Sequence, residues 1–343
     1  MKKLKRYIFI FLAVLIAAWF LGPKPANPEL DKNLPSLPAS VRNLDAFIEE
    51  KEKELNIRPD NESRIFWAHD SVKERTEYSL LYLHGFSASW YEGYPANMEF
   101  ARHFGCNAYF PRLASHGLDT DEALIDMTPD RLWESAKEAL MVARSLGKKV
   151  IIMSTSTGGT LSLKLAADFP EYVDGLIMYS PNIKINNGTA FLLSKPWGLQ
   201  IARSFYDGKY RVTSQDTLSK DCQYWYCKYR LEAVVYLQQL LEETMEKETF
   251  GKVTAPVFLG YYFKDKENQD EVVKVDAMLK MFDQLRTSPE RKVKKAFPGA
   301  GEHVIACELT SGSVDEVIAE TIKFGREILR LSPAEKPGGL TDF

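Results

Sequence analysis

Short apolar runs alternate with segments of helical spacing along most of the chain. The runs have the length of β-strands and fall at residues 65–68, 78–83, 107–110, 149–153, 175–179, 256–262 and 292–297. Apolar residues with helical spacing lie between them, at 97–104, 130–146 and 275–282. Short, mostly apolar strands are typical of sheets covered by helices on both faces. The pattern therefore predicts an α/β fold with a doubly wound, mainly parallel sheet.

The alternation stops between Pro181 and Val253. This stretch is rich in aromatic residues, has helical character and carries no recognisable strand signal. It is also far longer than an ordinary connection between a strand and a helix. We therefore expect a helical cap or lid at residues 183–250, inserted into an α/β core formed by residues 63–182 and 251–331.

The N-terminal segment differs from the rest of the chain. A basic cluster at residues 2–6 precedes a run without charge at residues 7–21. As a helix this run would be roughly 22 Å long, shorter than the ~30 Å apolar core of a bilayer. We expect residues 1–22 to be a signal peptide or an N-terminal membrane anchor. The charge distribution then predicts export, with the domain periplasmic or on the extracytoplasmic face of the membrane.

Residues 23–62 are expected to connect this segment to the core. The first part is rich in Pro, Asn and Lys and predicts an extended linker. Residues 41–55 have amphipathic spacing and predict a lead-in helix that packs on the domain. The formal net charge of the chain is -3, so no basic field favours nucleic acid as a partner.

The four cysteines leave one question open. Cys222 and Cys227 are close enough in sequence to pair in an oxidising compartment. On a continuous helix, however, their spacing would point the two thiols in different directions. Cys106 and Cys307 are expected to be packed thiols. The sequence has no CxxC and no HExxH motif, so we expect neither a metal nor another cofactor.

The most informative stretch is Ser154-Thr155-Ser156-Thr157-Gly158, which directly follows the run 149–153. Helical spacing resumes immediately afterwards. A strand, a tight turn and a helix in this order would lift the Ser156 hydroxyl to the apex of a nucleophile elbow. Ser154 stands where the usual G-x-S-x-G motif has its first glycine. Small polar residues also occur in ordinary surface loops, so this stretch alone does not establish a nucleophile.

A second motif, His84-Gly85-Phe86, follows the run 78–83. Ligands of open parallel sheets bind beyond the carboxyl ends of the strands, which is where this motif is expected. The backbone N–H groups of Phe86 and Thr157 could then form an oxyanion hole.

Together these motifs resemble the α/β-hydrolase superfamily, in particular its monoglyceride-lipase and serine-aminopeptidase-like branch. The resemblance covers roughly residues 63–330. It also includes the stretches Pro111-Arg112-Leu113-Ala114-Ser115-His116-Gly117 and Pro298-Gly299-Ala300-Gly301-Glu302-His303. It implies an α/β-hydrolase fold, a lid where the cap is expected, and a catalytic serine, acid and histidine in that order.

The histidine can be assigned by elimination. The chain has five histidines, and only His303 follows the last expected strand. The acid remains open between two residues. Counting along the strand places Asp265 at the family's position, whereas Asp270-Glu271-Val272-Val273 reproduces the D-x-V-V pattern that accompanies the family's carboxylate. An insertion on one side of the acid explains the conflict, and the motif favours Asp270, with Asp265 as the alternate acid.

These residues predict a serine hydrolase with the triad Ser156, His303 and Asp270 and an acyl-enzyme intermediate. The expected partner is a small-molecule ester with an apolar acyl part, as in a carboxylesterase or monoacylglycerol lipase. Two alternatives stay open: a small peptidase of the serine-aminopeptidase type, and a non-catalytic binding protein on the same fold.

Overall fold

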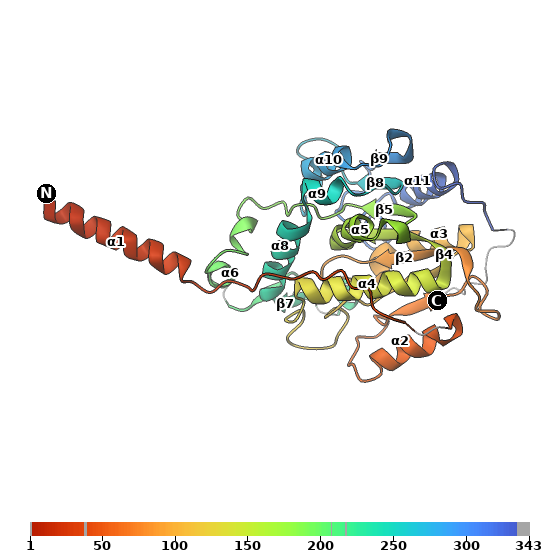
Figure 1. Ribbon diagram of the computed structural model, residues 1–343, viewed down its shortest axis with the longest axis horizontal. Coiled ribbons are helices and arrows are strands. Elements are labelled where there is room, and N and C mark those ends of the chain that lie inside the picture. Colours follow the sequence, from red (N-terminus) through yellow and green to blue (C-terminus); the bar gives the residue numbers. More distant parts are fainter. Residues whose placement is uncertain (1, 38–39, 207, 217, 335–343) are drawn as a thin grey trace.

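A seven-stranded sheet forms the centre of the protein (Figure 1). The computed structural model describes residues 2–37, 40–206, 208–216 and 218–334. The sheet has the order β1-β3-β2-β4-β5-β8-β9; β1 pairs antiparallel with β3 and the other pairs are parallel. The strands are β1 (Arg64–Phe66), β2 (Thr76–Leu83), β3 (Asn107–Phe110), β4 (Gly147–Thr155), β5 (Gly175–Tyr179), β8 (Val257–Tyr261) and β9 (Lys292–Ala296). The predicted doubly wound, mainly parallel sheet is confirmed.

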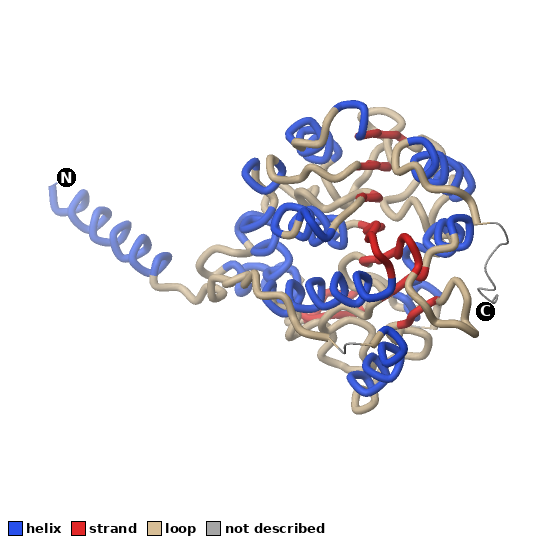
Figure 2. The backbone as a smooth tube through the Cα atoms, turned by 45° about the vertical axis from the view of Figure 1, so that its right-hand side comes forward, coloured by secondary structure: helices blue, strands red, loops and turns tan. Residues whose placement is uncertain are grey.

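Helices cover both faces of this sheet (Figure 2). Buried residues of four helices belong to the hydrophobic core on one face: α2 (Leu44–Glu52), α4 (Pro129–Leu146), α5 (Thr157–Asp168) and α10 (Val275–Gln284). Buried residues of α3 (Ala96–Phe104) and α11 (Val314–Glu327) belong to the core on the other face.

Strand β4 explains why the sheet is buried on both sides. Its residues Val150 and Ile152 belong to one core, and Ile151 and Met153 belong to the other. All four are completely buried. Because successive side chains of a strand point to opposite faces, an uninterrupted apolar run supplies both cores at once. Each such side chain contributes about 1.5–3 kcal/mol through burial, so β4 anchors the turn that follows it.

The cap contains strands as well as helices. Its helices are α6 (Gly198–Phe205), α7 (Lys220–Tyr224), α8 (Glu232–Thr244) and α9 (Lys247–Phe250). Strands β6 (Tyr210–Val212) and β7 (Lys228–Arg230) form an antiparallel pair. The expected cap is thus mainly helical, and the strand pair is a feature that the sequence did not predict. Strands of three residues carry too little alternation to be recognised in a sequence, and here they depend on pairing with each other.

The cap also contains a disulfide bond between Cys222 and Cys227, whose Cα atoms are 5.4 Å apart. Helix α7 ends at Tyr224, so Cys227 lies in a bend beyond it, just before β7. Because the two cysteines do not share a helix, their spacing does not separate the thiols. Cys106 and Cys307 are free and buried, as expected for packed thiols.

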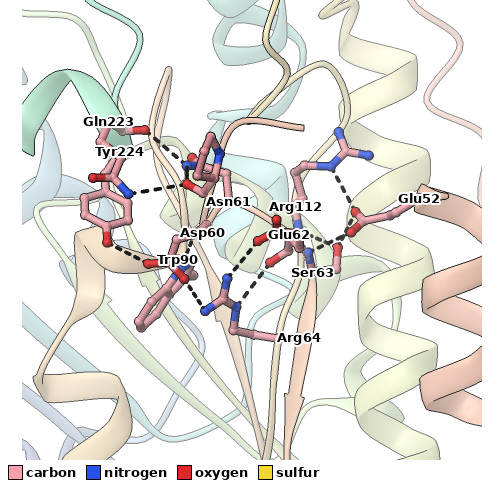
Figure 3. Close-up of polar contacts among 11 residues, drawn as sticks. Glu52, Asp60, Asn61, Glu62, Ser63, Arg64, Trp90, Arg112, Gln223 and Tyr224 are labelled. Carbon is pink, nitrogen blue, oxygen red and sulfur yellow. Dashed lines mark hydrogen bonds and ion pairs between the residues drawn. The ribbon is translucent and has the colours of Figure 1, made fainter. Parts of the chain in front are cut away.

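Polar contacts tie the disulfide loop to the edge of the core (Figure 3). The Tyr224 hydroxyl donates to Asp60 Oδ2 at 2.6 Å, and Asn61 Nδ2 donates to the Gln223 carbonyl at 3.1 Å. Arg58 Nη1 donates to the Trp225 carbonyl at 3.3 Å. The segment just before β1 therefore holds one end of the cap in place.

Helix α1 (Lys2–Phe20) projects away from the body of the protein (Figure 1). Among the described helices, none combines the length and the apolar character that a membrane crossing requires.

Residues 23–37, which follow α1, run along α4 without regular secondary structure (Figure 1). The buried Lys137 ammonium of α4 donates to the carbonyls of Asp31 at 2.8 Å and Asn33 at 2.7 Å. Gln239 Nε2 of α8 donates to the Ala26 carbonyl at 2.8 Å. This linker is thus bound to both the core and the cap.

Candidate active site

The residues expected to act together all follow the carboxyl ends of parallel strands. Ser156 follows β4, His84 follows β2, and the loops after β8 and β9 carry Asp270 and His303. The carboxyl ends of parallel strands meet at one edge of a sheet. The topology therefore brings these four segments to the same edge.

Ser156 occupies a strained turn between β4 and α5. Its backbone has φ 52° and ψ -117°, which a residue with a side chain rarely adopts. The neighbouring glycine explains why the turn is possible, because a Cβ atom at Gly158 would lie 1.9 Å from the Leu83 carbonyl oxygen. The Ser156 N–H donates to the Tyr179 carbonyl at 3.0 Å. The strand–turn–helix geometry expected of a nucleophile elbow is present.

Two backbone N–H groups beside this turn are free to bind an anion. Thr157 is the first residue of α5, so its N–H has no acceptor within the helix. The helix dipole adds partial positive charge at the same point. Among the described residues, no acceptor contacts the N–H of Phe86. These are the two donors that the sequence predicted.

His303 is held by a carboxylate. Its Nδ1 lies 2.6 Å from Asp270 Oδ2, and both side chains are buried. The other carboxylate oxygen, Oδ1, accepts the N–H groups of Val272 and Val273, each at 2.9 Å. Because Asp270 accepts the Nδ1 proton, Nε2 of the neutral ring keeps its lone pair. Nε2 is buried and has no hydrogen-bond partner among the described residues.

Asp265 lies elsewhere. It is partly exposed and accepts the backbone N–H groups of Glu267 at 3.0 Å and Asn268 at 2.8 Å, as well as the Asn268 side-chain amide. Contacts with Asn268 lower the pKa of this carboxyl. Asp265 therefore closes a surface turn, and the additional residues of this loop precede Asp270. Of the two candidate acids, the structure brings only Asp270 to His303.

The electrostatic surroundings of His303 favour its charged form. Burial lowers the pKa of the imidazole, but the charge of Asp270 and the hydrogen bond to it outweigh burial and raise the pKa above its ordinary value. Glu92 and Glu302 act in the same direction. A raised pKa makes the neutral ring a stronger base, as a group that accepts a proton requires.

Nε2 of His303 is not hydrogen-bonded to the Ser156 hydroxyl, because it has no partner in this structure. Such bonds are often long or absent without substrate and form in the complex. Gly85 and Glu92 lie close to Ser156: a Cβ atom at Gly85 would meet Ser156 Cβ at 3.0 Å and Glu92 Oε1 at 2.8 Å.

Two other histidines hold the Gly85–Phe86 turn. His84 Nε2 accepts the Leu113 N–H at 3.1 Å, and His116 Nε2 accepts the Ser87 N–H at 3.1 Å. Burial lowers the pKa of His84 to about 4, and burial also holds that of His116 well below its usual range. Both rings are neutral and fully engaged, so they support the turn.

One buried acid at this edge is not among the residues that the sequence predicted. Glu92 lies in the 3-10 helix η2 (Trp90–Gly93), is buried, and accepts the Gly85 N–H. The available signal was a single acid inside the aromatic stretch Trp90-Tyr91-Glu92-Gly93-Tyr94. Among the described residues, no group of His, Cys, Asp and Glu side chains is arranged to hold a metal ion.

A doubly wound sheet with a serine at a strained strand–helix turn, and a carboxylate-bound histidine at the same edge, defines the class of α/β hydrolases. The model of the Alpha/beta hydrolase family matches residues 80–309, which is more than half of the chain. The protein belongs to this family. The predicted membership is confirmed. No curated protein matches the sequence significantly.

Several solved structures have the same fold. One described under "LipS and LipT, two metagenome-derived lipolytic enzymes" has a TM-score of 0.63 and 16% identity, covering 79% of this chain and 99% of that one. A monoacylglycerol lipase from Paleococcus ferrophilus has a TM-score of 0.53 and 14% identity, with coverages of 79% and 98%. A monoglyceride lipase from Saccharomyces cerevisiae has a TM-score of 0.51 and 14% identity, with coverages of 79% and 91%.

Proposed function

We propose that this hydrolase is a serine esterase with the triad Ser156, His303 and Asp270. The observation that carries the proposal is the buried His303 ring, which is bound to Asp270 through Nδ1 and has a free Nε2. This is the arrangement required of a base that Asp270 orients. The strained Ser156 turn at the same edge supplies the hydroxyl.

In the proposed reaction, Ser156 Oγ attacks the carbonyl carbon of the ester while His303 Nε2 accepts the hydroxyl proton. The carbonyl oxygen becomes an oxyanion that accepts hydrogen bonds from the N–H groups of Phe86 and Thr157. Collapse of this intermediate releases the alcohol, which takes the proton from His303. Water then cleaves the acyl-enzyme by the same steps, and Asp270 stabilises the imidazolium in both halves.

We infer an ester with an apolar acyl part as the substrate. The names of the structurally similar proteins support this inference, since they include lipolytic enzymes and monoacylglycerol lipases. The cap contributes aromatic surface beside the turn that carries Phe86, because the Tyr229 ring packs against the Phe86 ring at 5.1 Å. An apolar wall of this kind suits an acyl chain.

A fluorophosphonate probe tests the proposed nucleophile. We expect the wild-type protein to be labelled and to hydrolyse p-nitrophenyl esters, whereas folded Ser156→Ala does neither. Folded wild-type protein that resists the probe and leaves the esters intact would instead be a non-catalytic binding protein. A series of ester chain lengths, run beside aminoacyl amides, measures the acyl preference; faster cleavage of the amides would assign a peptidase.

We further propose that the domain is exported, with membrane contact through its N-terminal segment. The basic cluster followed by an uncharged run supports export, as does the disulfide between Cys222 and Cys227, because such bonds persist in oxidising compartments. Thiol labelling of denatured protein from cells, with and without reductant, tests the compartment. Cys222 and Cys227 labelled only after reduction fit export, and labelling without reductant contradicts it.

A further inference from the structure

Glu92 is a buried acid that the proposed reaction leaves without a role. It is 2% exposed and sits in η2, directly behind the turn that follows β2. Its carboxylate accepts the backbone N–H of Gly85, the residue before Phe86. A buried carboxylate is costly unless it is hydrogen-bonded, so its presence here calls for a physical reason.

The hydrogen bonds around the turn single out one N–H group. The Gly85 N–H donates to Glu92, and the Ser87 N–H donates to His116 Nε2. The Phe86 N–H between them has no acceptor among the described residues. Glu92 and His116 thus bind the two flanking donors and leave the middle one available to a ligand.

Steric contacts place the same carboxylate next to the nucleophile. A Cβ atom at Gly85 would lie 2.8 Å from Glu92 Oε1, 3.0 Å from Glu92 Oε2 and 3.0 Å from Ser156 Cβ. Glu92 and Ser156 therefore both lie against Gly85. The carboxylate that binds the Gly85 N–H is thus close both to the turn that carries Phe86 and to Ser156.

We propose that Glu92 is a positioning residue for ester hydrolysis: its carboxylate holds the Gly85–Phe86 turn so that the Phe86 N–H faces the developing oxyanion, and its charge acts on His303. This inference rests on the proposed function. It adds a residue that acts through Gly85 and His303 without contacting the ester itself.

The carboxylate of Glu92 interacts with several groups of the candidate site. The groups that face it are Tyr82 of β2, Trp225 of the disulfide loop, the Gly85 N–H, His303 and Cys307. Burial raises the pKa of Glu92 to about 7, although the Gly85 hydrogen bond and His303 oppose this rise. In return, Glu92 reinforces Asp270 and Glu302 in raising the pKa of His303. Neutralising Glu92 therefore lowers the pKa of His303.

Two substitutions separate positioning from charge. Glu92→Gln keeps an acceptor for the Gly85 N–H but removes the charge, whereas Glu92→Leu removes both. For Glu92→Leu we expect kcat to fall by about 10–100-fold with KM within about 3-fold, because a displaced oxyanion donor affects the transition state. For Glu92→Gln we expect kcat within about 5-fold of wild type and the acid limb of the kcat/KM–pH profile moved to lower pH.

Glu308→Gln is the matched control. Glu308 accepts a hydrogen bond from Tyr91, the neighbour of Glu92 in η2, and it does not contact Gly85. We expect its kcat and its pH profile to equal those of the wild type. A shift in this control as large as that in Glu92→Gln would show a general charge effect and overturn the proposal.

The outcomes distinguish a failure of the proposed esterase function from a failure of the proposed role of Glu92. Wild-type protein without esterase activity or fluorophosphonate labelling ends the proposed function, and this proposal with it. If the wild type is active but folded Glu92→Leu keeps its kcat, only the role of Glu92 is wrong. If Glu92→Leu does not fold, Glu92→Gln decides. An acid limb at the wild-type pH, or a kcat more than about 10-fold below that of the wild type, contradicts the proposal.

Discussion

The edge of the sheet that carries the candidate active site and the cap are stabilised in different ways. At the edge, main-chain atoms leave no room for a side chain: a Cβ atom at Gly158 would overlap the Leu83 carbonyl, and one at Gly159 would lie 2.9 Å from Pro181 Cα. Helix α8 of the cap packs into the core through Ala233, Leu237 and Leu240, and the rest of the cap adds a short strand pair, a disulfide and side-chain hydrogen bonds. The cap also exposes large apolar side chains, with Phe205 81% and Leu218 95% exposed.

This difference distinguishes the two parts of the molecule. Backbone packing between buried strands sets the positions of Ser156 and of the N–H groups of Phe86 and Thr157. The cap packs α8 into the same core, but its outer part depends on polar contacts and leaves large apolar side chains exposed. We therefore expect substitutions at the edge to have large effects on activity or folding, and substitutions in the cap to have smaller ones.

The largest effect is expected at Asp270, and Asp265 in the same loop provides the control. Asp270→Asn removes the acceptor that sets the His303 tautomer, and we expect kcat to fall by about 10⁴-fold. Asp265→Asn, in the same loop, changes only a surface turn and is expected to keep kcat within about 2-fold. Initial rates with a p-nitrophenyl ester measure both. Equal activities of the two variants would refute the assignment of Asp270.

Replacing one glycine at the edge and one in the cap by alanine compares how much room each region leaves for a methyl group. Gly158→Ala places Cβ 1.9 Å from the Leu83 carbonyl oxygen, and we expect a loss of about 3 kcal/mol or more in the free energy of unfolding. At Gly188, in the cap region, a Cβ atom would meet nothing within 4 Å, so Gly188→Ala is expected to change stability by less than about 0.5 kcal/mol. Denaturant titrations measure both, and a Gly158→Ala protein as stable as the wild type would disprove the steric argument.

Within the cap, the disulfide is expected to make a moderate contribution. The double variant Cys222→Ser, Cys227→Ser frees a short loop in the unfolded chain, and the expected loss is about 2 kcal/mol in the free energy of unfolding. Reductant should destabilise the wild type by a similar amount and leave the double variant unchanged. If reductant affects the double variant equally, the stabilisation comes from another source.

The smallest effect is expected at a polar contact between core and cap. Glu122, in the core, accepts hydrogen bonds from Tyr210 and Arg230 in the cap strands. The Tyr210 hydrogen bond is the main cause that lowers the pKa of Glu122 to about 2. Because the pKa is depressed in the folded state, the contact stabilises the protein above about pH 4.5 and this stabilisation is lost as the pH falls towards 2.

Glu122→Gln tests this dependence. We expect its stability to decline less steeply than that of the wild type between about pH 4.5 and 2, as measured by thermal unfolding over that range. Parallel curves for the two proteins would show that the carboxylate does not couple core and cap.

The fold and much of the site were predictable because their signals are local. The buried strands are continuous apolar runs, and the predicted limits of β3 and β5 match the structure. The turn at Ser156 is marked by adjacent small residues, and the position of His303 followed from the order of the strands. The strands and the turn are each specified by a few neighbouring residues, whereas His303 is identified by its place after the last strand.

The remaining features depend on contacts between distant segments. Strands β6 and β7 pair across the cap, and the disulfide forms because α7 stops at Tyr224. The linker binds α4 through carbonyl groups, which no side-chain pattern reveals.

The sequence alone determined the layered α/β architecture and the serine and histidine on which the proposed chemistry depends, because hydrophobic burial and turn sterics act over short stretches of chain. Only the tertiary structure decided between the two aspartates and revealed Glu92 beside Gly85. Which carboxylate reaches an imidazole, and which one is buried behind a turn, is set by how loops from separate strands meet in space.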